Sequence, residues 1–299
     1  MTKFEVIIVG GSYAGLAAAM GLGRALRSVL VVDSGMAANR FTPRSHNFLT
    51  HDGRTPSEIA GIARDQVGQY DTVDRIDAVA VKAEKTSTGF KITLNDGVIV
   101  SSSKLVLATG IIDIMPDIPG LAECWGKSVL HCPYCHGYEV RETPTGILGN
   151  GDYAFEFASL ISNWTRDLTI YTDGPSRLST GQTKKLASHN IRIVEDRIKL
   201  FKNTDGNLEK ILFANGMTAE VKAVYTRPAF KQHSDLAVSL GCEMTEEGYI
   251  KIDSGMRTTT NGVYACGDNA SKMRTVANAV SMGTTAAITL NKDMITESF

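Results

Sequence analysis

The 299-residue sequence carries almost no net charge and contains little cysteine. Its 31 Lys and Arg residues are balanced by 32 Asp and Glu residues, so nothing in the charge favours a nucleic acid or an anionic membrane as a partner. Five cysteines, an odd number, are too few for a secreted disulfide scaffold, so we expect a reduced, cytoplasmic compartment. A hydrophobic content of 43% excludes a mostly disordered chain, and at roughly 150 residues per domain the length predicts two domains.

A hydrophobic run long enough for a clear membrane span is also missing. The stretch from Val6 to Gly23 has 18 residues without a charge, which is the lower limit for a spanning helix. It contains five glycines, and Gly-Gly-Ser interrupts it after a short apolar run, a pattern typical of a strand, a tight turn and a helix. Glu5 and the lack of a small-residue cleavage site argue against a signal peptide. We therefore expect a soluble protein with no membrane contact.

The N-terminal residues have the pattern of a βαβ unit. A strand is expected over residues 4–9, a glycine turn over 10–15, and a helix from there to Arg27. A second strand over residues 29–32 ends at Asp33. Both strands are continuously apolar, which is typical of parallel strands buried on both faces.

The glycine turn of this unit predicts a dinucleotide site. Gly10 permits the tight turn, Gly15 lets the helix pack close to the strand, and the helix N-terminus offers free N–H groups to a pyrophosphate. Asp33 follows Gly10 by 23 residues, near the expected ~20, where a carboxylate can accept a hydrogen bond from a ribose hydroxyl. Ser12 replaces the middle glycine of the usual pattern and is small enough for close approach of a ligand.

The middle of the chain contains short strands and then a crossing between domains. Asn95-Asp96-Gly97 is a strong hairpin signal between residues 90–94 and 98–100. Pro116, Pro119 and Gly120 follow and indicate the passage into a second domain.

A second βαβ unit repeats the first about 139 residues later, as in an internal duplication. We expect a strand over residues 146–148, a helix from 153 to 164 and a strand over 168–171. Its turn, Gly149-x-Gly151-x-x-Ala154, fits the variant G-x-G-x-x-A. Asp173 follows the second strand with no basic cluster for a 2′-phosphate, so the turn suits NAD if it binds a nucleotide. A nicotinamide site, NAD(P)H, and a plain glycine turn both stay open.

Cys132 and Cys135 form a Cys-x-x-Cys pair between the two units. Two thiols at this spacing close a small ring, and such motifs lower the pKa of a thiol. Attachment of c-type haem, a zinc site and mere packing are the alternatives. Zinc would need a second ligand pair, but Cys124, Cys242 and Cys266 are scattered, so redox chemistry is favoured and no metal site is expected.

Near the C-terminus, an apolar strand ends at Gly267-Asp268, ahead of a helix expected from Thr275 to Ile288. Cys266 in that strand is interpreted as a small buried hydrophobe. The four histidines outside the Cys-x-x-Cys segment have no evident partner and are interpreted as structural or surface residues: His46, His51, His189 and His233.

Taken together, these motifs resemble the thioredoxin-reductase-like flavoproteins over nearly the whole chain. The motifs on which this resemblance rests are the two glycine turns, Asp33, Ala108-Thr109-Gly110 with the prolines after it, the Cys-x-x-Cys pair, and residues 265–268. The resemblance implies an α/β fold with two Rossmann-like dinucleotide-binding domains of three-layer ββα type, the second inserted in the first. It assigns residues 1–114 and 240–299 to an FAD-binding domain and 115–239 to an NAD(P)-binding-like domain with the redox motif, and it implies a homodimer.

The resemblance also assigns roles to residues. Asp268 would bond the ribityl chain of FAD, and the helix beginning near Arg274 and Thr275 would point its N-terminus at the flavin ring. Cys135 would face the flavin, while Cys132 exchanges with the external thiol or disulfide. The full set expected to hold FAD is Gly10, Ser12, Gly15, Asp33, Thr109, Gly110, Gly267, Asp268, Arg274 and Thr275.

Two departures from thioredoxin reductases stand out. Thr172-Asp173-Gly174 replaces their basic cluster, and His136 replaces the acid that follows their second cysteine. The segment from Cys132 to Glu139 is more similar to the gliotoxin and holomycin dithiol oxidases. His136, with an ordinary pKa near ~6.5 for its residue type, is suited to carry protons, and Glu139 could orient it.

The direction of electron flow stays open at this point. A reductase would pass electrons from a nicotinamide or ferredoxin through FAD to a disulfide, for example in a thioredoxin-like protein. An oxidase would close a small dithiol and reduce oxygen. A redox-sensing or haem-binding protein is the non-enzymatic alternative.

Overall fold

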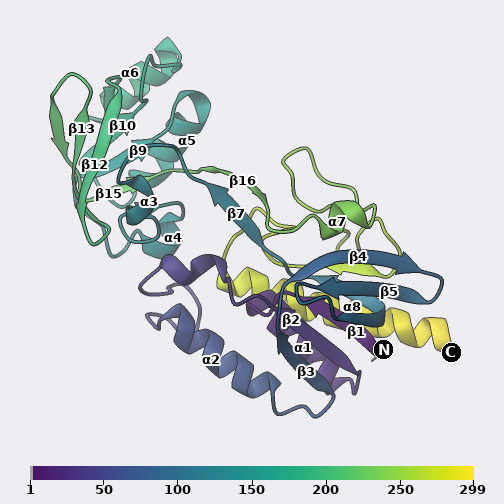
Figure 1. Cartoon of the computed structure of the whole chain (residues 1–299). Coiled ribbons are helices and arrows are strands. Elements are labelled where there is room, and N and C mark those ends of the chain that lie inside the picture. Colours follow the sequence, from purple (N-terminus) through teal and green to yellow (C-terminus); the bar gives the residue numbers. More distant parts are fainter. Residues whose placement is uncertain (1–2) are drawn as a thin grey trace.

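The computed structural model describes residues 3–299 and has two lobes (Figure 1). The purple N-terminal and yellow C-terminal segments share one lobe, and the teal middle of the chain forms the other. The chain leaves the first lobe along β7 (Ile111–Ile114) and returns along β16 (Ala229–Gln232), and these strands pair antiparallel. The second unit is therefore inserted in the first, as expected.

The first lobe contains a seven-stranded sheet. Its parallel part has the order β3-β2-β1-β6, and β17 pairs parallel with the C-terminal residues 105–107 of β6. On the same side of β6, its N-terminal residues 99–102 pair antiparallel with β5, and β4 follows β5. The strands are β1 (Lys3–Val9), β2 (Val29–Asp33), β3 (Val73–Asp77), β4 (Ala80–Thr86), β5 (Gly89–Leu94), β6 (Ile99–Leu107) and β17 (Val263–Ala265). The helices are α1 (Tyr13–Arg24), η1 (Ala38–Phe41), α2 (Pro56–Val67), α7 (Leu236–Ser239) and α8 (Val276–Ser298).

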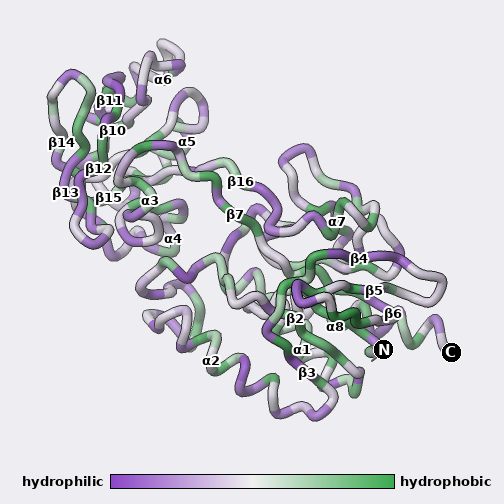
Figure 2. Tube along the Cα trace, in the orientation of Figure 1, coloured by the Kyte–Doolittle hydropathy of each residue, from purple (hydrophilic) through white to green (hydrophobic). Residues whose placement is uncertain are grey.

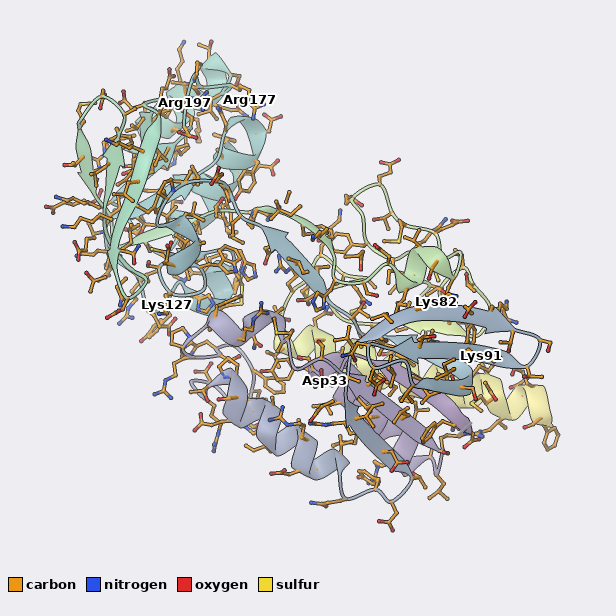
Figure 3. The ribbon with its side chains drawn as sticks, viewed as in Figure 1. Asp33, Lys82, Lys91, Lys127, Arg177 and Arg197 are labelled. Carbon is orange, nitrogen blue, oxygen red and sulfur yellow. A yellow bond between two sulfur atoms is a disulfide. The ribbon has the colours of Figure 1, made fainter. Side chains whose placement is uncertain are left out.

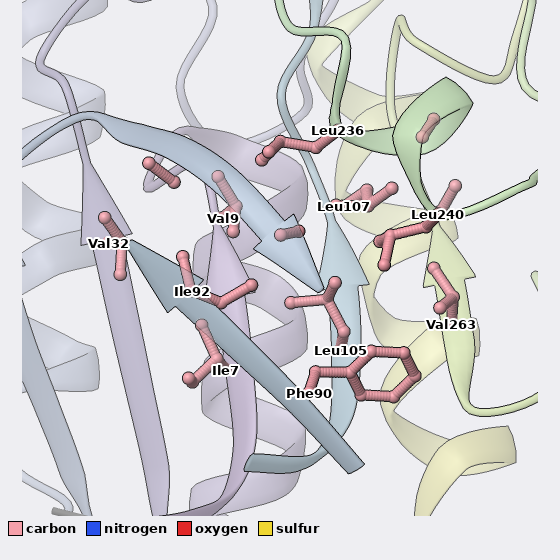
Figure 4. Packing of buried hydrophobic residues seen from close by; sticks show 14 of the residues in the cluster. Ile7, Val9, Val32, Phe90, Ile92, Leu105, Leu107, Leu236, Leu240 and Val263 are labelled. Carbon is pink, nitrogen blue, oxygen red and sulfur yellow. The ribbon is translucent and has the colours of Figure 1, made fainter. Parts of the chain in front are cut away.

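Strand β1 is buried on both faces from Val6 to Val9, which explains the unbroken apolar run of these four residues. Ile7 and Val9 belong to the core cluster that includes β4 and β5 (Figure 4). The alternate residues Val6 and Ile8 pack in the cluster that contains α1 and α8. Figure 2 shows hydrophobic residues along β1 and β2 and hydrophilic residues in the outer loops. The result is a helical layer, the main sheet and the β4–β5 arm, the three-layer arrangement that was predicted.

The second lobe repeats this plan on a smaller scale. Its parallel sheet has the order β11-β10-β9-β15-β8 and is covered on one face by helices and on the other by a three-stranded sheet. The parallel strands are β8 (Val129–Leu130), β9 (Thr145–Leu148), β10 (Leu168–Tyr171), β11 (Arg192–Val194) and β15 (Ala223–Tyr225). The remaining elements are α3 (Leu121–Cys124), α4 (Pro133–His136), α5 (Gly151–Ile161), α6 (Thr180–Ser188), β12 (Ile198–Thr204), β13 (Asn207–Phe213) and β14 (Thr218–Glu220).

Three helices differ from expectation, while the Asn95-Asp96-Gly97 hairpin is confirmed between β5 and β6. Helix α5 runs from Gly151 to Ile161 rather than from 153 to 164. Helix α1 ends at Arg24 rather than Arg27, because Leu26 adopts a left-handed φ of 61°. Helix α8 continues ten residues past Ile288, since no glycine or proline stops it. Asp293 then ties its last turns to the sheet, where it accepts hydrogen bonds from Arg257 and Tyr264. Within residues 3–299, no helix combines the length and apolarity needed to cross a bilayer.

Candidate active site

The first glycine turn allows no side chain at two positions. Gly10 has a φ of +107°, and a Cβ there would lie 2.2 Å from the carbonyl oxygen of Ala108. A Cβ on Gly15 would lie 1.8 Å from the carbonyl oxygen of Gly10. The turn therefore packs α1 against the ends of β1 and β6, and this places the start of α1 at the edge of the sheet.

A cleft opens at this edge, and we call it the first cleft. Nine of the ten residues expected to hold FAD line it, and it encloses about 820 Å³ of space, part of it open to solvent. The tenth, Gly15, lies directly beneath. The nine residues are Gly10, Ser12, Asp33, Thr109, Gly110, Gly267, Asp268, Arg274 and Thr275.

Charged groups with unfilled bonding capacity lie in the first cleft. Arg274 donates two hydrogen bonds to Asp113, at 2.8 and 2.7 Å, but its Nε has no hydrogen-bond partner among the described residues. The carboxylate of Asp268 lies 3.9 Å from that Nε, and burial raises the pKa of Asp268 to about 6 despite the nearby guanidinium. A ligand with hydroxyl and polar ring atoms would satisfy these groups. The cleft thus fits FAD. Asp33 and Asp268, the two acidic residues predicted to meet an adenosine ribose and the ribityl chain, both line it.

The Cys-x-x-Cys segment forms the short helix α4 and the residue before it. Cys132 and Cys135 are joined by a disulfide with their Cα atoms 5.3 Å apart. The backbone N–H of Cys135 donates to Cys132 Sγ at 3.2 Å, a donor that would stabilise a thiolate there after reduction. Both cysteines are half-buried, so the disulfide is open to a reactant on one side.

Cys135 lines a second cleft, which lies between the lobes. Its walls include Phe41 and His46 from the first lobe and Trp125 and His136 from the second. The first and second clefts are continuous, since six residues line both: Ala38, Asn39, Asp268, Arg274, Thr275 and Val276. The structure therefore brings the disulfide to the end of the proposed FAD site.

Two histidines flank the disulfide in sequence and are both withdrawn from solvent. His131 stacks on Trp125 with ring centroids 5.8 Å apart, and burial lowers the pKa of His131 to about 4, so it is neutral near pH 7. Burial also lowers the pKa of His136, partly opposed by the charge of Glu139. A neutral imidazole beside Cys135 can accept a proton, as the proposed role of His136 requires.

Glu139 pairs with a histidine from the other lobe, His46. Their nearest atoms, Glu139 Oε1 and His46 Nε2, are 3.5 Å apart, so Glu139 affects His136 only through its field. The structure thus supplies for His46 the partners that the sequence did not reveal. It does so for His233 too, which lines the first cleft with its Nδ1 3.2 Å from the carbonyl oxygen of Thr109. No local sequence signal marks either histidine, because their partners come from distant segments.

The second glycine turn is filled by the chain itself. The side-chain oxygen of Asn150 accepts hydrogen bonds from the N–H groups of Gly151 and Arg177, at 2.9 and 2.7 Å. The ring of Tyr153 lies over Gly149, where a Cβ would be only 2.7 Å from Tyr153 Cε1. One of the N–H groups at the start of α5 and part of the space over the turn, both of which a pyrophosphate would use, are thus taken by the chain itself.

The carboxylate of the acidic residue after β10, Asp173, also has partners within the chain. Asp173 accepts a hydrogen bond from the N–H of Ile198 at 2.7 Å and lies 3.6 Å from Arg197. Arg177 and Arg197 both belong to the far tip of the second lobe (Figure 3). Because Arg197 is neutralised by Asp173 and the turn is closed, this site in its present conformation does not fit a nicotinamide nucleotide.

An FAD cleft that leads to a redox disulfide defines a flavin-dependent thiol/disulfide oxidoreductase. Residues 4–283 match the family described as pyridine nucleotide-disulphide oxidoreductase, and the chain belongs to this family. The protein is an FAD-dependent enzyme of the thioredoxin-reductase-like group.

Individual relatives agree with this assignment. The chain is 34% identical to "Thioredoxin reductase aclD" of Aspergillus oryzae, over 95% of this chain and 94% of that protein. Among solved structures, it is similar to a putative thioredoxin reductase TrxB from Bacillus anthracis, with a TM-score of 0.95 and 32% identity over 99% of this chain and 100% of that one. It is also similar to HlmI, with a TM-score of 0.92 and 33% identity over 99% and 94% of the two chains.

Proposed function

We propose that the enzyme oxidises a small dithiol at the Cys132–Cys135 disulfide and passes the electrons to oxygen. The observation that carries the proposal is the second cleft, which lies between the lobes, reaches Cys135 and is continuous with the first cleft. Small-molecule sites occur preferentially at such boundaries between domains. The closed second glycine turn supports the proposal, because it leaves no fitted site for a nicotinamide donor.

The exchange at the disulfide follows from the chain's own groups. A substrate thiolate attacks Cys132 Sγ, the disulfide breaks, and Cys135 leaves as a thiolate. The second substrate thiol then attacks the substrate sulfur of the mixed disulfide, which releases Cys132 and a cyclic substrate disulfide. Two electrons move to the cysteine pair, and His136 accepts one of the two protons released. FAD, when bound beside Cys135, supplies the two-electron carrier that returns the pair to the disulfide with oxygen as final acceptor.

We propose that the ten residues deduced from the sequence hold FAD in this enzyme, and that residues 1–114 and 240–299 belong to the FAD-binding domain. The second domain ends before residue 239, because the chain returns along β16 and α7 packs in the core of the first lobe. From the family resemblance we further propose a homodimer, and from the sparse cysteines a cytoplasmic location.

Reduction of a protein disulfide is the second candidate function. Tyr134 and Tyr138 beside the disulfide are 63% and 67% exposed, which gives a protein substrate an apolar surface to contact. Relatives named thioredoxin reductase, such as "Thioredoxin reductase tcpT" of Claviceps purpurea at 33% identity, favour this direction. In that case electrons would have to come from a donor that does not use the second turn, such as ferredoxin.

An anaerobic titration of the purified yellow protein tests the proposal. NADPH, NADH and dithiothreitol are added in separate runs while the flavin absorbance is followed, and air is then admitted. We expect bleaching by the dithiol alone, with colour and peroxide returning in air. Bleaching by a stoichiometric nicotinamide would overturn the oxidase assignment, and no response to any of the three would point to a protein donor.

The Cys135→Ser variant should keep FAD and lose all dithiol-dependent bleaching, because the exchange needs both sulfurs. Cys242→Ser, which changes a buried free cysteine in the first lobe, is the matched control and should bleach as the wild type does. Bleaching that persists in Cys135→Ser would mean that the disulfide is not on the electron path.

A further inference from the structure

The loop between η1 and α2 reaches from the first lobe to the redox turn of the second (Figure 1). His46 on this loop is held from both sides. Its Nδ1 is 3.3 Å from Asp52 Oδ2 and its Nε2 is 3.5 Å from Glu139 Oε1. Asp52 is itself fixed, because its other oxygen accepts the N–H of Asn47 at 2.7 Å. His46 is thus oriented by its own loop before it meets Glu139.

The contact between His46 and Glu139 has no counterpart elsewhere at the lobe boundary. Among ion pairs within residues 3–299, it is the only one that joins the first lobe to residues 115–228. Arg274 and Asp113 form a second pair nearby, but Asp113 is on the connecting strand β7. Glu139 follows Cys135 by four residues, so a force on Glu139 acts directly on the redox turn.

We propose that His46 is a positioning residue that clamps the Cys132–His136 turn against the first lobe and so holds Cys135 toward the clefts. The inference rests on the proposed function, since it assigns the clamp to the same disulfide. His46 touches neither sulfur in any contact described above. Its effect on the reaction is to limit the orientations of the turn.

Alkylation of the reduced holoenzyme tests the clamp without turnover. The protein is reduced with a phosphine and treated with iodoacetamide, and the modification of Cys135 is followed by mass spectrometry of the peptide. We expect His46→Gln and Glu139→Gln each to increase the Cys135 alkylation rate about threefold to tenfold. The double variant should show no more than the larger single effect, because both changes break one contact. His189→Gln, at the exposed end of α6, is the control and should match the wild type.

Kinetics separate positioning from general loss of structure. The same two variants should reduce the rate of disulfide reduction by dithiothreitol about tenfold with little change in KM, and His46→Arg, which can donate to both carboxylates, should restore most of it. Additive effects of the two variants would overturn the clamp.

Failure of the clamp and failure of the proposed function give different results. If the wild type does not react with dithiols but the alkylation effects occur, the oxidase assignment fails and the clamp stands. If dithiols reduce the wild type and both variants equally, and alkylation is unchanged, the clamp fails and the oxidase assignment stands.

Discussion

The two glycine turns have similar sequences but different surroundings. In the first lobe the turn opens on a cleft, and Asp33 bonds only the nearby N–H of Gly35 among the described residues. In the second, Asn150 and Tyr153 fill the corresponding space, and Asp173 is bound to Ile198 and Arg197. A G-x-G-x-x-G/A pattern therefore specifies the backbone path from strand to helix. Whether a nucleotide binds depends on the side chains at the variable positions, which either leave the N–H groups free or use them.

The closest packing in the first turn gives the largest expected effect. Gly15→Ala would force a methyl group to 1.8 Å from the carbonyl oxygen of Gly10, so α1 would have to move away from the turn. We expect loss of most FAD and a decrease of about 3 kcal/mol in the free energy of unfolding, measured by flavin absorbance and urea denaturation. The equivalent residue of the second turn is already alanine, Ala154.

Gly97→Ala is the control that distinguishes backbone strain from a steric clash of the added Cβ. Gly97 also has a positive φ, but nothing lies within 4 Å of its Cβ position. This variant should lower the free energy of unfolding by only about 1 kcal/mol and should retain its FAD. Full FAD content in Gly15→Ala would contradict the proposed packing role of the first turn.

The buried carboxylate of Asp268 destabilises the folded apoprotein. Burial raises the pKa of Asp268 from 3.8 to about 6, so the folded state holds the proton more tightly than the unfolded chain. Below about pH 4, Asp268 is protonated in both the folded and the unfolded state and does not change the free energy of unfolding. As pH rises from 4 to 6, Asp268 increasingly lowers the free energy of unfolding, and above pH 6 this destabilisation is complete. At ~1.36 kcal/mol per pKa unit it reaches about 3 kcal/mol.

The Asp268→Asn variant should therefore stabilise the apoprotein by up to about 3 kcal/mol at pH 7.5 and by nearly nothing at pH 4, while it weakens FAD binding. Urea denaturation of the FAD-free protein at both pH values checks this. Asp235→Asn, on the exposed surface beside α7, is the control and should change neither. Equal stabilisation at both pH values would rule out burial of the charge as the cause.

Removal of the side chains that fill the second glycine turn tests whether they prevent nucleotide binding. The double variant Asn150→Gly, Tyr153→Ser removes the two side chains that fill it and frees the N–H groups of Gly151 and Arg177. We expect at least a tenfold increase in NADH affinity, or about 1.4 kcal/mol, measured by tryptophan fluorescence. Tight binding of NADH to the wild type would show that the turn opens readily, and the contrast between the lobes would disappear.

Sequence patterns predicted what is local in this fold. The buried strands, both glycine turns and the Cys-x-x-Cys segment are each set by a few adjacent residues, and the nine residues that line the first cleft come from motifs at strand ends. The partners of His46 and Asp173 could not be predicted in this way. Glu139 reaches His46 only because the lobes meet, and Arg197 reaches Asp173 only because the loop after β11 packs on the end of β10. Such pairs depend on tertiary packing and leave no period or spacing in the sequence.

The acidic residues at the two strand ends give the smallest expected effects and the most direct contrast. Asp33→Asn replaces a free carboxylate in the first cleft, so FAD affinity should fall severalfold, about 1 kcal/mol, with little change in stability. Asp173→Asn replaces a carboxylate paired with a 70%-exposed arginine, so stability should change by less than about 1 kcal/mol and FAD affinity not at all. Equilibrium dialysis of FAD and urea denaturation of both variants measure the two quantities. If Asp173→Asn weakened FAD binding as much as Asp33→Asn, the lobes would be coupled, and the closed turn of the second lobe would have to act on the first cleft across β7 and β16.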